Sequence, residues 1–550
     1  MKQGISLFLA LALWLTAGCA RQASHEDVAE GQVLAARGET AAVPLYENLG
    51  TYNHRITTNN PRVQQYFDQG VRLAYAFNHA EAIRAFNEAA RLDPACAMCY
   101  WGTAYAYGPH VNAPMDSAGG VAAYAALQKA IAAAPKASPR EQAYIRALTE
   151  RYAANPPADR ARLDSAYARA IGKVALEYPD DPDAAALHAE ARMDLRPWNY
   201  WTKSGEPYPG TAELVADLER VLAANPNHPG ACHFYIHAVE AVAPEKAVPC
   251  AERLAGLMPG AGHLVHMPAH IFIRVGRWAD AIESNIHAVH TDETYIADQR
   301  PSGVYPVAYY PHNYHFLAFA STMAGRSRQA IDAARKLVEK VPVEVARQVP
   351  PVEPLVPYLH LTLLNFGRWD DLLREPLPPS DLRFATGMVH YTRGVAFAAK
   401  GNWAEAEQAL DTVRQIHTAT AAGDNKTVLE IATLALAGEI AARRDRLADA
   451  ETSFRQAMRL EDGLLYFEPP PWPYPIRHSL GAVLLRAGRA AEAEALYRED
   501  LKRFPENGWA LHGLAASLRA QGKTDELGAV EQRFARAWTG ADVQLTASRF

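Results

Sequence analysis

The stretch that decides the fold is residues 63–96, VQQYFDQGVRLAYAFNHAEAIRAFNEAARLDPAC. Small residues at positions 8 and 20 of such a 34-residue unit let two helices approach closely. The larger residue at position 24 packs into a neighbouring hairpin, and proline at position 32 ends the second helix. Positions 8, 20, 24, 27 and 32 are here Gly70, Ala82, Phe86, Ala89 and Pro94.

The same spacing recurs along the chain. Clear copies cover residues 311–344, 387–420, 431–464 and 474–507, and weaker copies start near residues 228, 262, 353 and 506. This pattern resembles the tetratricopeptide repeat (TPR) family over most of residues 60–540. The resemblance implies an all-α solenoid of helical hairpins, which forms a superhelix with a concave groove. It also implies a protein or peptide bound in that groove, without naming this partner.

The N-terminus reads as a targeting segment. Lys2 precedes a short apolar run, and residues 16–19, TAGC, resemble the lipobox of bacterial lipoproteins. We therefore expect a signal peptide at residues 1–18 and a lipidated Cys19 at the start of a polar tether, residues 19–59. The anchor would place the protein in the cell envelope, at the outer membrane facing the periplasm. An ordinary cleaved signal peptide with a chance cysteine is the alternative.

The remaining chain is predicted to fall into three segments. Residues 60–226 form N-terminal hairpins of irregular spacing, and residues 346–550 form C-terminal hairpins. Between them, residues 227–345 form histidine-rich hairpins that an insertion at residues 291–310 interrupts. Long insertions in a repeat array are often functional, although aromatic and proline residues also patch irregular joints.

Composition excludes some classes of function. The 550-residue chain has a formal net charge of -6, which argues against nucleic acid as a partner because that would require a basic face. The sequence contains no phosphate-binding glycine loop and no nucleophile elbow, so it identifies no catalytic residue.

Ten of the 20 histidines fall between His228 and His315. In the TPR family, positions 2, 5, 9, 12 and 13 of the first helix line the groove. The resemblance therefore implies that His188, at position 9 of its hairpin, faces the groove. It implies the same for the histidines at positions 2, 5 and 9 of the next hairpins: His263, His266, His270, His312 and His315.

A second stripe of polar residues lies beside this set. His233, His237 and Glu240 are spaced by four and three residues, so they share one side of a helix at positions 6, 10 and 13. By contrast, His228 is expected to start a helix, and we interpret it, His287 and His290 as surface residues. The other histidines are interpreted as structural.

Imidazoles in this pattern suit a divalent transition metal: zinc, copper, nickel or iron. Glu240 would complete the ligand shell or orient a histidine. The segment HFYIHAVE lacks the glutamate of the HExxH motif, so it does not predict a zinc protease. Contacts to an anionic peptide, pH-sensitive contacts and the absence of any site stay open as alternatives. The predicted metal ligands are His233, His237, Glu240, His263, His266, His270, His312 and His315.

Four cysteines remain beyond Cys19, which allows three pairings in an oxidising compartment. Cys96 and Cys99 form CAMC, which is neither a haem-attachment motif nor half of a zinc site, and their pairing stays open. Cys232 and Cys250 lie at positions 5 and 23, which antiparallel helices bring together. A disulfide there is one interpretation, and two small buried apolar residues are the other.

Three functions are compatible with these features. The first is an envelope binding scaffold whose histidine-lined groove binds a metal. The second is a metal-dependent hydrolase or oxidoreductase with its site in that groove. The third is a purely structural scaffold of an envelope complex. Whether the ligand set leaves an open coordination position discriminates between the first two.

Overall fold

The computed structural model describes residues 43–115, 117–301 and 305–550. The predicted signal peptide, Cys19 and tether residues up to 42 lie outside them. The described chain forms two compact units. The N-terminal unit comprises the described residues of 43–268 and 290–306, and the C-terminal unit comprises those of 269–289 and 307–550. This division falls inside the histidine-rich segment.

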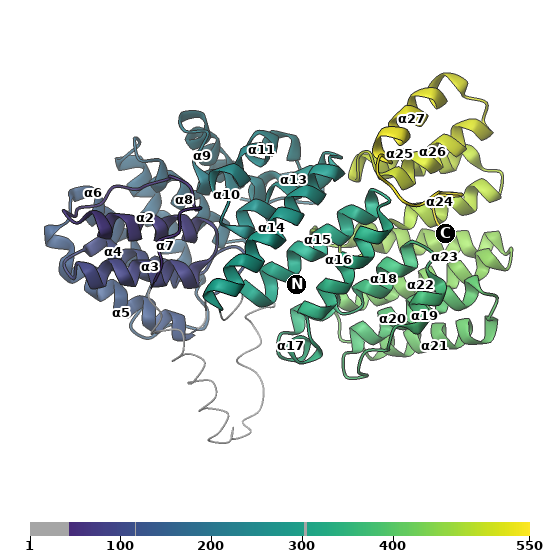
Figure 1. The fold of residues 1–550 in the computed structure, drawn as a ribbon, viewed down its shortest axis with the longest axis horizontal. Coiled ribbons are helices and arrows are strands. Elements are labelled where there is room, and N and C mark those ends of the chain that lie inside the picture. Colours follow the sequence, from purple (N-terminus) through teal and green to yellow (C-terminus); the bar gives the residue numbers. More distant parts are fainter. Residues whose placement is uncertain (1–42, 116, 302–304) are drawn as a thin grey trace. The chain divides into compact units, whose positions relative to one another are not determined.

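The N-terminal unit is built from helices that pack on their neighbours in the chain, drawn from purple to teal in Figure 1. For example, α2 begins after Asn60, whose side chain accepts a hydrogen bond from the Arg62 backbone N–H and thereby caps the helix. The helices are α2 (Pro61–Tyr75), α3 (His79–Leu92), α4 (Ala97–Ala106), α5 (Ser117–Ala133), α6 (Pro139–Leu148), α7 (Ala161–Glu177), α8 (Pro182–Asp194), α9 (Thr211–Ala224), α10 (Pro229–Val239), α11 (Val248–Leu257) and α12 (Gly262–His266).

Two helices carry the chain across the boundary between the units, α13 (Pro268–Arg274) and α14 (Trp278–Gln299). The C-terminal unit continues with helical pairs and ends in a non-helical segment, residues 540–550. Its further helices are α15 (Tyr310–Met323), α16 (Ser327–Lys340), α17 (Val343–Gln348), α18 (Tyr358–Asn365), α19 (Trp369–Arg374), α20 (Arg383–Ala399), α21 (Trp403–Ala419), α22 (Asp424–Arg443), α23 (Leu447–Gly463), α24 (Ile476–Arg486), α25 (Ala490–Arg503), α26 (Gly508–Ala520) and α27 (Thr524–Ala537).

The packing confirms the predicted hairpin. α2 packs on α3, and the Phe86 ring of α3 fills the space that two glycines leave. A Cβ atom at Gly70 or at Gly102 would lie 2.5 Å from this ring. Phe86 therefore joins its own hairpin to the next one, as position 24 of the repeat predicts.

The C-terminal unit repeats this arrangement. A Cβ atom at Gly481 of α24 would lie 2.4 Å from the Tyr497 ring of α25, and one at Gly513 of α26 would lie 2.3 Å from the same ring. Both units are stacks of TPR-like helical hairpins, so the all-α prediction is confirmed. The described residues contain no β-sheet, only two isolated bridges. Among their helices, none has both the length and the apolar character needed to cross a membrane.

Residues 43–60, which we call the strap, correct the predicted tether. The prediction treated residues up to 59 as a polar spacer, but the strap packs against the helices of the N-terminal unit. The Tyr46 backbone N–H donates to Oε1 of Gln69 (2.8 Å), and the Tyr52 hydroxyl donates to Oδ1 of Asp183 (2.7 Å). Buried carboxylates and amides of the helices therefore hold the strap in place.

The predicted insertion at 291–310 is shorter than expected. Residues 291–299 extend α14, and residues 305–309 form one π-helical turn. A different irregularity lies earlier in the chain, where α12 ends at His266 and α13 begins at Pro268. Proline cannot donate a backbone hydrogen bond, which explains the break.

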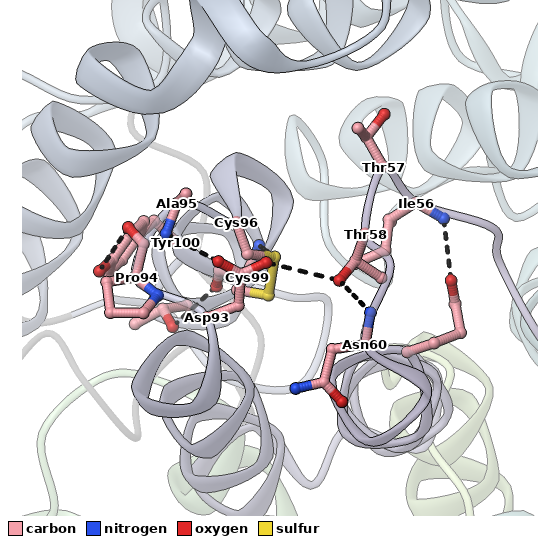
Figure 2. The surroundings of a disulfide bond; sticks show 12 residues. Ile56, Thr57, Thr58, Asn60, Asp93, Pro94, Ala95, Cys96, Cys99 and Tyr100 are labelled. Atoms are coloured by element: carbon pink, nitrogen blue, oxygen red, sulfur yellow. Dashed lines mark hydrogen bonds between the residues drawn. A yellow bond between two sulfur atoms is a disulfide. The ribbon is translucent and has the colours of Figure 1, made fainter.

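The structure distinguishes between the pairings that the sequence leaves open for the cysteines. Cys96 and Cys99 form a disulfide at the start of α4, close to strap residue Thr58 (Figure 2). Of the two interpretations of Cys232 and Cys250, the structure matches the second, because both residues are buried free thiols. The helices that carry them, α10 and α11, nevertheless pack against each other, so the helix pairing behind the disulfide interpretation holds.

Candidate metal centre

Three buried histidines converge in the N-terminal unit, and we call them the histidine triad. His233 and His237 lie on α10, and His263 lies on α12. Nε2 of His233 lies 3.1 Å from Nε2 of His237 and 3.1 Å from Nε2 of His263. One ligand atom of each ring lies within 4.8 Å of the other two, and the residues are at most 3% exposed.

The sequence of α10 explains the first two positions. The helix begins at Pro229, and the His228 ring caps it by accepting a hydrogen bond from the Ala231 backbone N–H (3.1 Å). Residues four apart on an α-helix share one face, so His233 and His237 point to the same side.

A short helix supplies the third ring. α12 spans five residues, and a Cβ atom at Gly262 would collide with the Asp292 carboxylate. The Tyr305 hydroxyl donates to Oδ1 of Asp292 (2.7 Å) and accepts a hydrogen bond from the His263 backbone N–H. Asp292 and Tyr305 thus fix the start of α12 and with it the position of His263.

Hydrogen bonding assigns the tautomer of His233. Its Nδ1 lies 2.7 Å from the Tyr75 carbonyl oxygen, which can only accept, so Nδ1 carries the hydrogen. In the neutral ring, the Nε2 lone pair then faces the other two histidines. The Glu240 carboxylate lies 4.0 Å from Nδ1 of His237, the nitrogen that does not face the triad. The hydrogen bond from His233 to a backbone carbonyl is typical of metal-bound histidines, whereas the 4.0 Å separation places Glu240 near His237 without a hydrogen bond between these two atoms.

An aromatic ring shields one side of the triad. The centroid of Phe77 lies 4.4 Å from that of His233, 5.7 Å from His263 and 6.0 Å from His237. It also stacks on His110 at 4.3 Å. Phe77 follows α2 with φ 55°, a left-handed conformation that a bulky residue rarely adopts. Phe77 thus places an apolar ring against all three histidines of the triad.

Two further histidines, His79 and His110, lie behind Phe77, and the sequence predicts only a structural role for both. The rings of His79 and His110 are 4.5 Å apart. Burial lowers the pKa of His79 to about 4 and that of His110 well below its ordinary value. Both rings are therefore neutral at pH 7. No sequence pattern indicates that His79 and His110 lie near the triad, because they come from a different part of the chain.

The triad fits a transition-metal ion. Zinc–nitrogen bonds of about 2.0–2.1 Å in a tetrahedron place the ligand nitrogens about 3.3 Å apart. The two Nε2–Nε2 separations of 3.1 Å approach this value. Three neutral nitrogen donors match zinc, copper, nickel and iron better than magnesium or calcium, which prefer oxygen ligands.

The other predicted ligands do not join the triad. His266 is fully buried, and its ring centroid lies 6.1 Å from that of His263. Three further predicted ligands belong to the C-terminal unit. There Nδ1 of His270 lies 3.1 Å from Oε2 of Glu468, and its ring centroid lies 5.9 Å from that of half-buried His312. His315 packs against Tyr358, and burial lowers the pKa of His315 to about 3.

Burial also corrects the surface predictions. Most of the histidines that were expected to face a groove are buried within their own units. His188 is half-buried, with Nδ1 at 2.8 Å from Oδ2 of Asp217. His228 was predicted to lie on the surface, yet it is 0% exposed because it caps α10 beneath the strap. His287 and His290 are exposed, as predicted.

A second group of potential ligands anchors the strap. Nδ1 of His54 lies 2.6 Å from Oδ2 of Asp183, and Asp181 lies within reach of both. The Tyr52 and Tyr75 hydroxyls donate to the same Asp183 carboxylate. The direct contact between His54 and Asp183 leaves no room for an ion between them, so we interpret the group as an ion pair.

The charges of this pair are set by its surroundings. Burial disfavours protonation of His54, but the carboxylates of Asp183, Asp181 and Asp68 outweigh burial and raise its pKa from 6.5 to about 9. Burial alone would raise the pKa of Asp183. The His54 charge and hydrogen bonds from His54 and His228 instead hold it well below the ordinary value.

Comparisons with known proteins add no functional information. No protein-family model and no curated protein matches the chain. Human IFIT1, solved as a dimer with m7Gppp-AAAA, is 12% identical with a TM-score of 0.32, over 88% of this chain and 91% of that one. Yeast Tom70 is 14% identical with a TM-score of 0.26, over 87% and 95%. The TPR domain of P58(IPK) is 12% identical with a TM-score of 0.19, over 84% and 99%.

Proposed function

We propose that this chain is a TPR-like binding scaffold whose N-terminal unit holds one divalent transition-metal ion on His233, His237 and His263. The convergence of three buried Nε2 atoms, with two separations of 3.1 Å, carries the proposal. Zinc, copper, nickel and iron all suit this donor set. A bound ion would supply a Lewis acid in a site that Phe77 covers on one side.

The surrounding residues prepare the triad for an ion. The hydrogen bond from His233 to the Tyr75 carbonyl keeps the Nε2 lone pair directed at the site. Glu240 lies on the far side of His237, where a carboxylate makes the ring more basic. Substitution of such an orienting group weakens metal binding by about tenfold to hundredfold.

A metal-dependent hydrolase or oxidoreductase is the second candidate. Three histidine ligands leave a fourth tetrahedral position, which catalytic zinc sites give to water or substrate and structural sites fill with a fourth side chain. Co2+ substitution separates the two. A pH-dependent visible spectrum of the cobalt protein supports a metal-bound water and hence an enzyme, whereas a pH-independent spectrum supports a closed binding site.

The metal proposal is tested by titrating the untagged chain with Co2+ and Zn2+ in competition with a chromophoric chelator. We expect one site per chain in the wild type. His263→Ala should weaken it by at least about hundredfold, because a ligand contributes more than an orienting group. His188→Ala is the matched control, because His188 belongs to the same unit but lies outside the triad. Equal binding by wild type and His263→Ala would refute the proposal.

We also propose that the C-terminal unit binds an acidic segment of a partner protein. A cavity of about 420 Å3 is lined by the last turn of α22, most of α24, the middle of α26 and residues 546–550. Arg443, Arg486 and Arg549 line it, against Glu439 as the one acidic side chain among its described lining residues. Its net positive charge favours an anionic ligand.

The segment 540–550 shows how an extended chain is held on this unit. The Ser548 hydroxyl donates to the His478 carbonyl (2.8 Å), and the Arg443 guanidinium donates to a main-chain oxygen of Phe550 (2.9 Å). Binding of a fluorescent poly-glutamate peptide tests the proposal. Arg486→Ala should weaken it by about tenfold, and Arg519→Ala, a salt-bridged arginine outside the cavity, should not. An equal effect of the two substitutions would contradict it.

We further propose that Cys19 carries a lipid that anchors the protein in the cell envelope, at the outer membrane facing the periplasm. The lipobox-like residues 16–19 support this. In bacteria grown with labelled palmitate, the wild type should incorporate label and sediment with outer membranes. Cys19→Ala should do neither. Membrane sedimentation of both proteins without label would contradict lipidation.

A further inference from the structure

A ligand-sized cavity lies in the N-terminal unit beside the strap. Its volume is about 240 Å3, which is room for about eight water molecules at about 30 Å3 each. The strap residues Tyr46, Asn48 and Leu49, the C-terminal end of α2 and the turn at residues 259–261 form part of its wall. The last part of α14 and Tyr305 complete it. The cavity thus has the size of a small organic molecule.

Three tyrosines give this wall its chemistry. The Tyr46 hydroxyl donates to Oε1 of Glu81 (2.9 Å), and the Tyr295 hydroxyl lies 3.5 Å from Oε2 of the same residue. The Tyr305 hydroxyl donates to Oδ1 of Asp292 (2.7 Å). Because the hydroxyl hydrogens go to buried carboxylates, the phenol oxygens offer only acceptor capacity to a ligand.

The same carboxylates make the tyrosines hard to ionise. Burial is the main cause that raises the pKa values of Tyr46 and Tyr295 above that of a free tyrosine, and the negative charge of Glu81 raises them further. Burial and Asp292 do the same for Tyr305. The phenols stay neutral at pH 7, and their rings keep the electron-rich faces that attract cations.

Ring geometry and charge point to a positively charged ligand. The rings of Tyr295 and Tyr305 are 5.4 Å apart and meet at 74°, so they form two perpendicular walls. Asp298 adds an exposed carboxylate at the wall, and none of the described lining residues is lysine or arginine. Arg84 neutralises Glu81, which leaves the charges of Asp298 and Asp292 beside the cavity.

We propose that this cavity binds a small organic ammonium ion. Perpendicular tyrosine rings and a nearby carboxylate are the recognition elements that quaternary ammonium groups use. The described wall carries the Asp298 carboxylate and no lysine or arginine, so its charge disfavours a phosphate or carboxylate ligand. The site does not depend on the proposed metal, because a quaternary nitrogen has no lone pair with which to coordinate an ion.

The test measures binding of choline to the full chain by calorimetry at constant ionic strength. The neutral isostere 3,3-dimethyl-1-butanol has the same shape without the charge. We expect saturable choline binding with one site, and about fivefold to thirtyfold weaker binding of the isostere, as the loss of a cation–π contact predicts.

Two variants with one matched control locate the site. Asp298→Asn and Tyr295→Leu should each weaken choline binding by about fivefold or more. Glu293→Gln removes an exposed carboxylate from the same helix but outside the cavity, so it should leave the affinity unchanged. Three results would overturn the proposal: no saturable binding up to about 10 mM choline, equal affinity for the isostere, or equal effects of Asp298→Asn and Glu293→Gln.

Discussion

Replacing His54 by glutamine should weaken the N-terminal unit by an amount that depends on pH. The His54–Asp183 pair is only 13% and 6% exposed, and the pKa of His54 rises from 6.5 to about 9 on folding. One pKa unit corresponds to about 1.4 kcal/mol, so the full shift stabilises the fold by about 3 kcal/mol. The shift of Asp183 describes the same interaction and is not added.

The sign of the effect follows from linkage. A folded-state pKa above the unfolded value gives stability that is complete below the unfolded pKa, near pH 6.5, and disappears as pH rises through about 9. We therefore expect the pH-dependent loss in His54→Gln to be about 3 kcal/mol near pH 6, about 2 kcal/mol near pH 7.5 and close to zero near pH 10.

Urea unfolding followed by circular dichroism, with wild type and variant compared at each pH, measures this loss from the shift in midpoint. Asp183→Asn should show the same dependence on rising pH. His287→Gln, at an exposed position, should change stability by less than about 0.5 kcal/mol. A loss of equal size near pH 6 and near pH 10 would show that packing, and not the ion pair, accounts for the effect.

Other predictions concern packing and the cysteines. Gly70→Ala should destabilise the fold by about 1–3 kcal/mol, because its Cβ atom would lie 2.5 Å from Phe86, and a wild-type melting temperature would contradict the packing. A Cβ atom at Gly256 would contact nothing within 4 Å, so Gly256→Ala should stabilise α11 by up to about 1 kcal/mol in the same measurement. In protein unfolded without reductant, an alkylating reagent should modify Cys232 and Cys250, and it should modify Cys96 and Cys99 only after reduction. Mass spectrometry of the alkylated chain measures both outcomes.

Much of the fold could be predicted from sequence because the repeat encodes it locally. Gly70 and Phe86 lie in one hairpin, so their spacing reports a contact that the hairpin itself creates. The strap could not be predicted in this way. Its hydrogen bonds join Tyr52 and His54 to Asp183, which lies about 130 residues further along the chain. A polar composition alone does not distinguish such a segment from a tether.

The candidate site was predicted in part. His233 and His237 share a helical face because they are four residues apart. The repeat register includes His263 among the predicted ligands. The cover of Phe77 and His110 comes from other hairpins, so only the tertiary structure reveals it. The disulfide prediction for Cys232 and Cys250 placed the helices correctly, but helix pairing decides proximity and not oxidation state.

The most direct test of the account is the metal content of the untagged chain after incubation with Zn2+ and gel filtration, measured by plasma mass spectrometry. We predict one zinc ion per chain for the wild type and for His188→Ala, and none for the double variant His233→Ala with His263→Ala. A wild type that retains no zinc, or a double variant that retains as much as the wild type, would contradict the histidine triad as a metal centre.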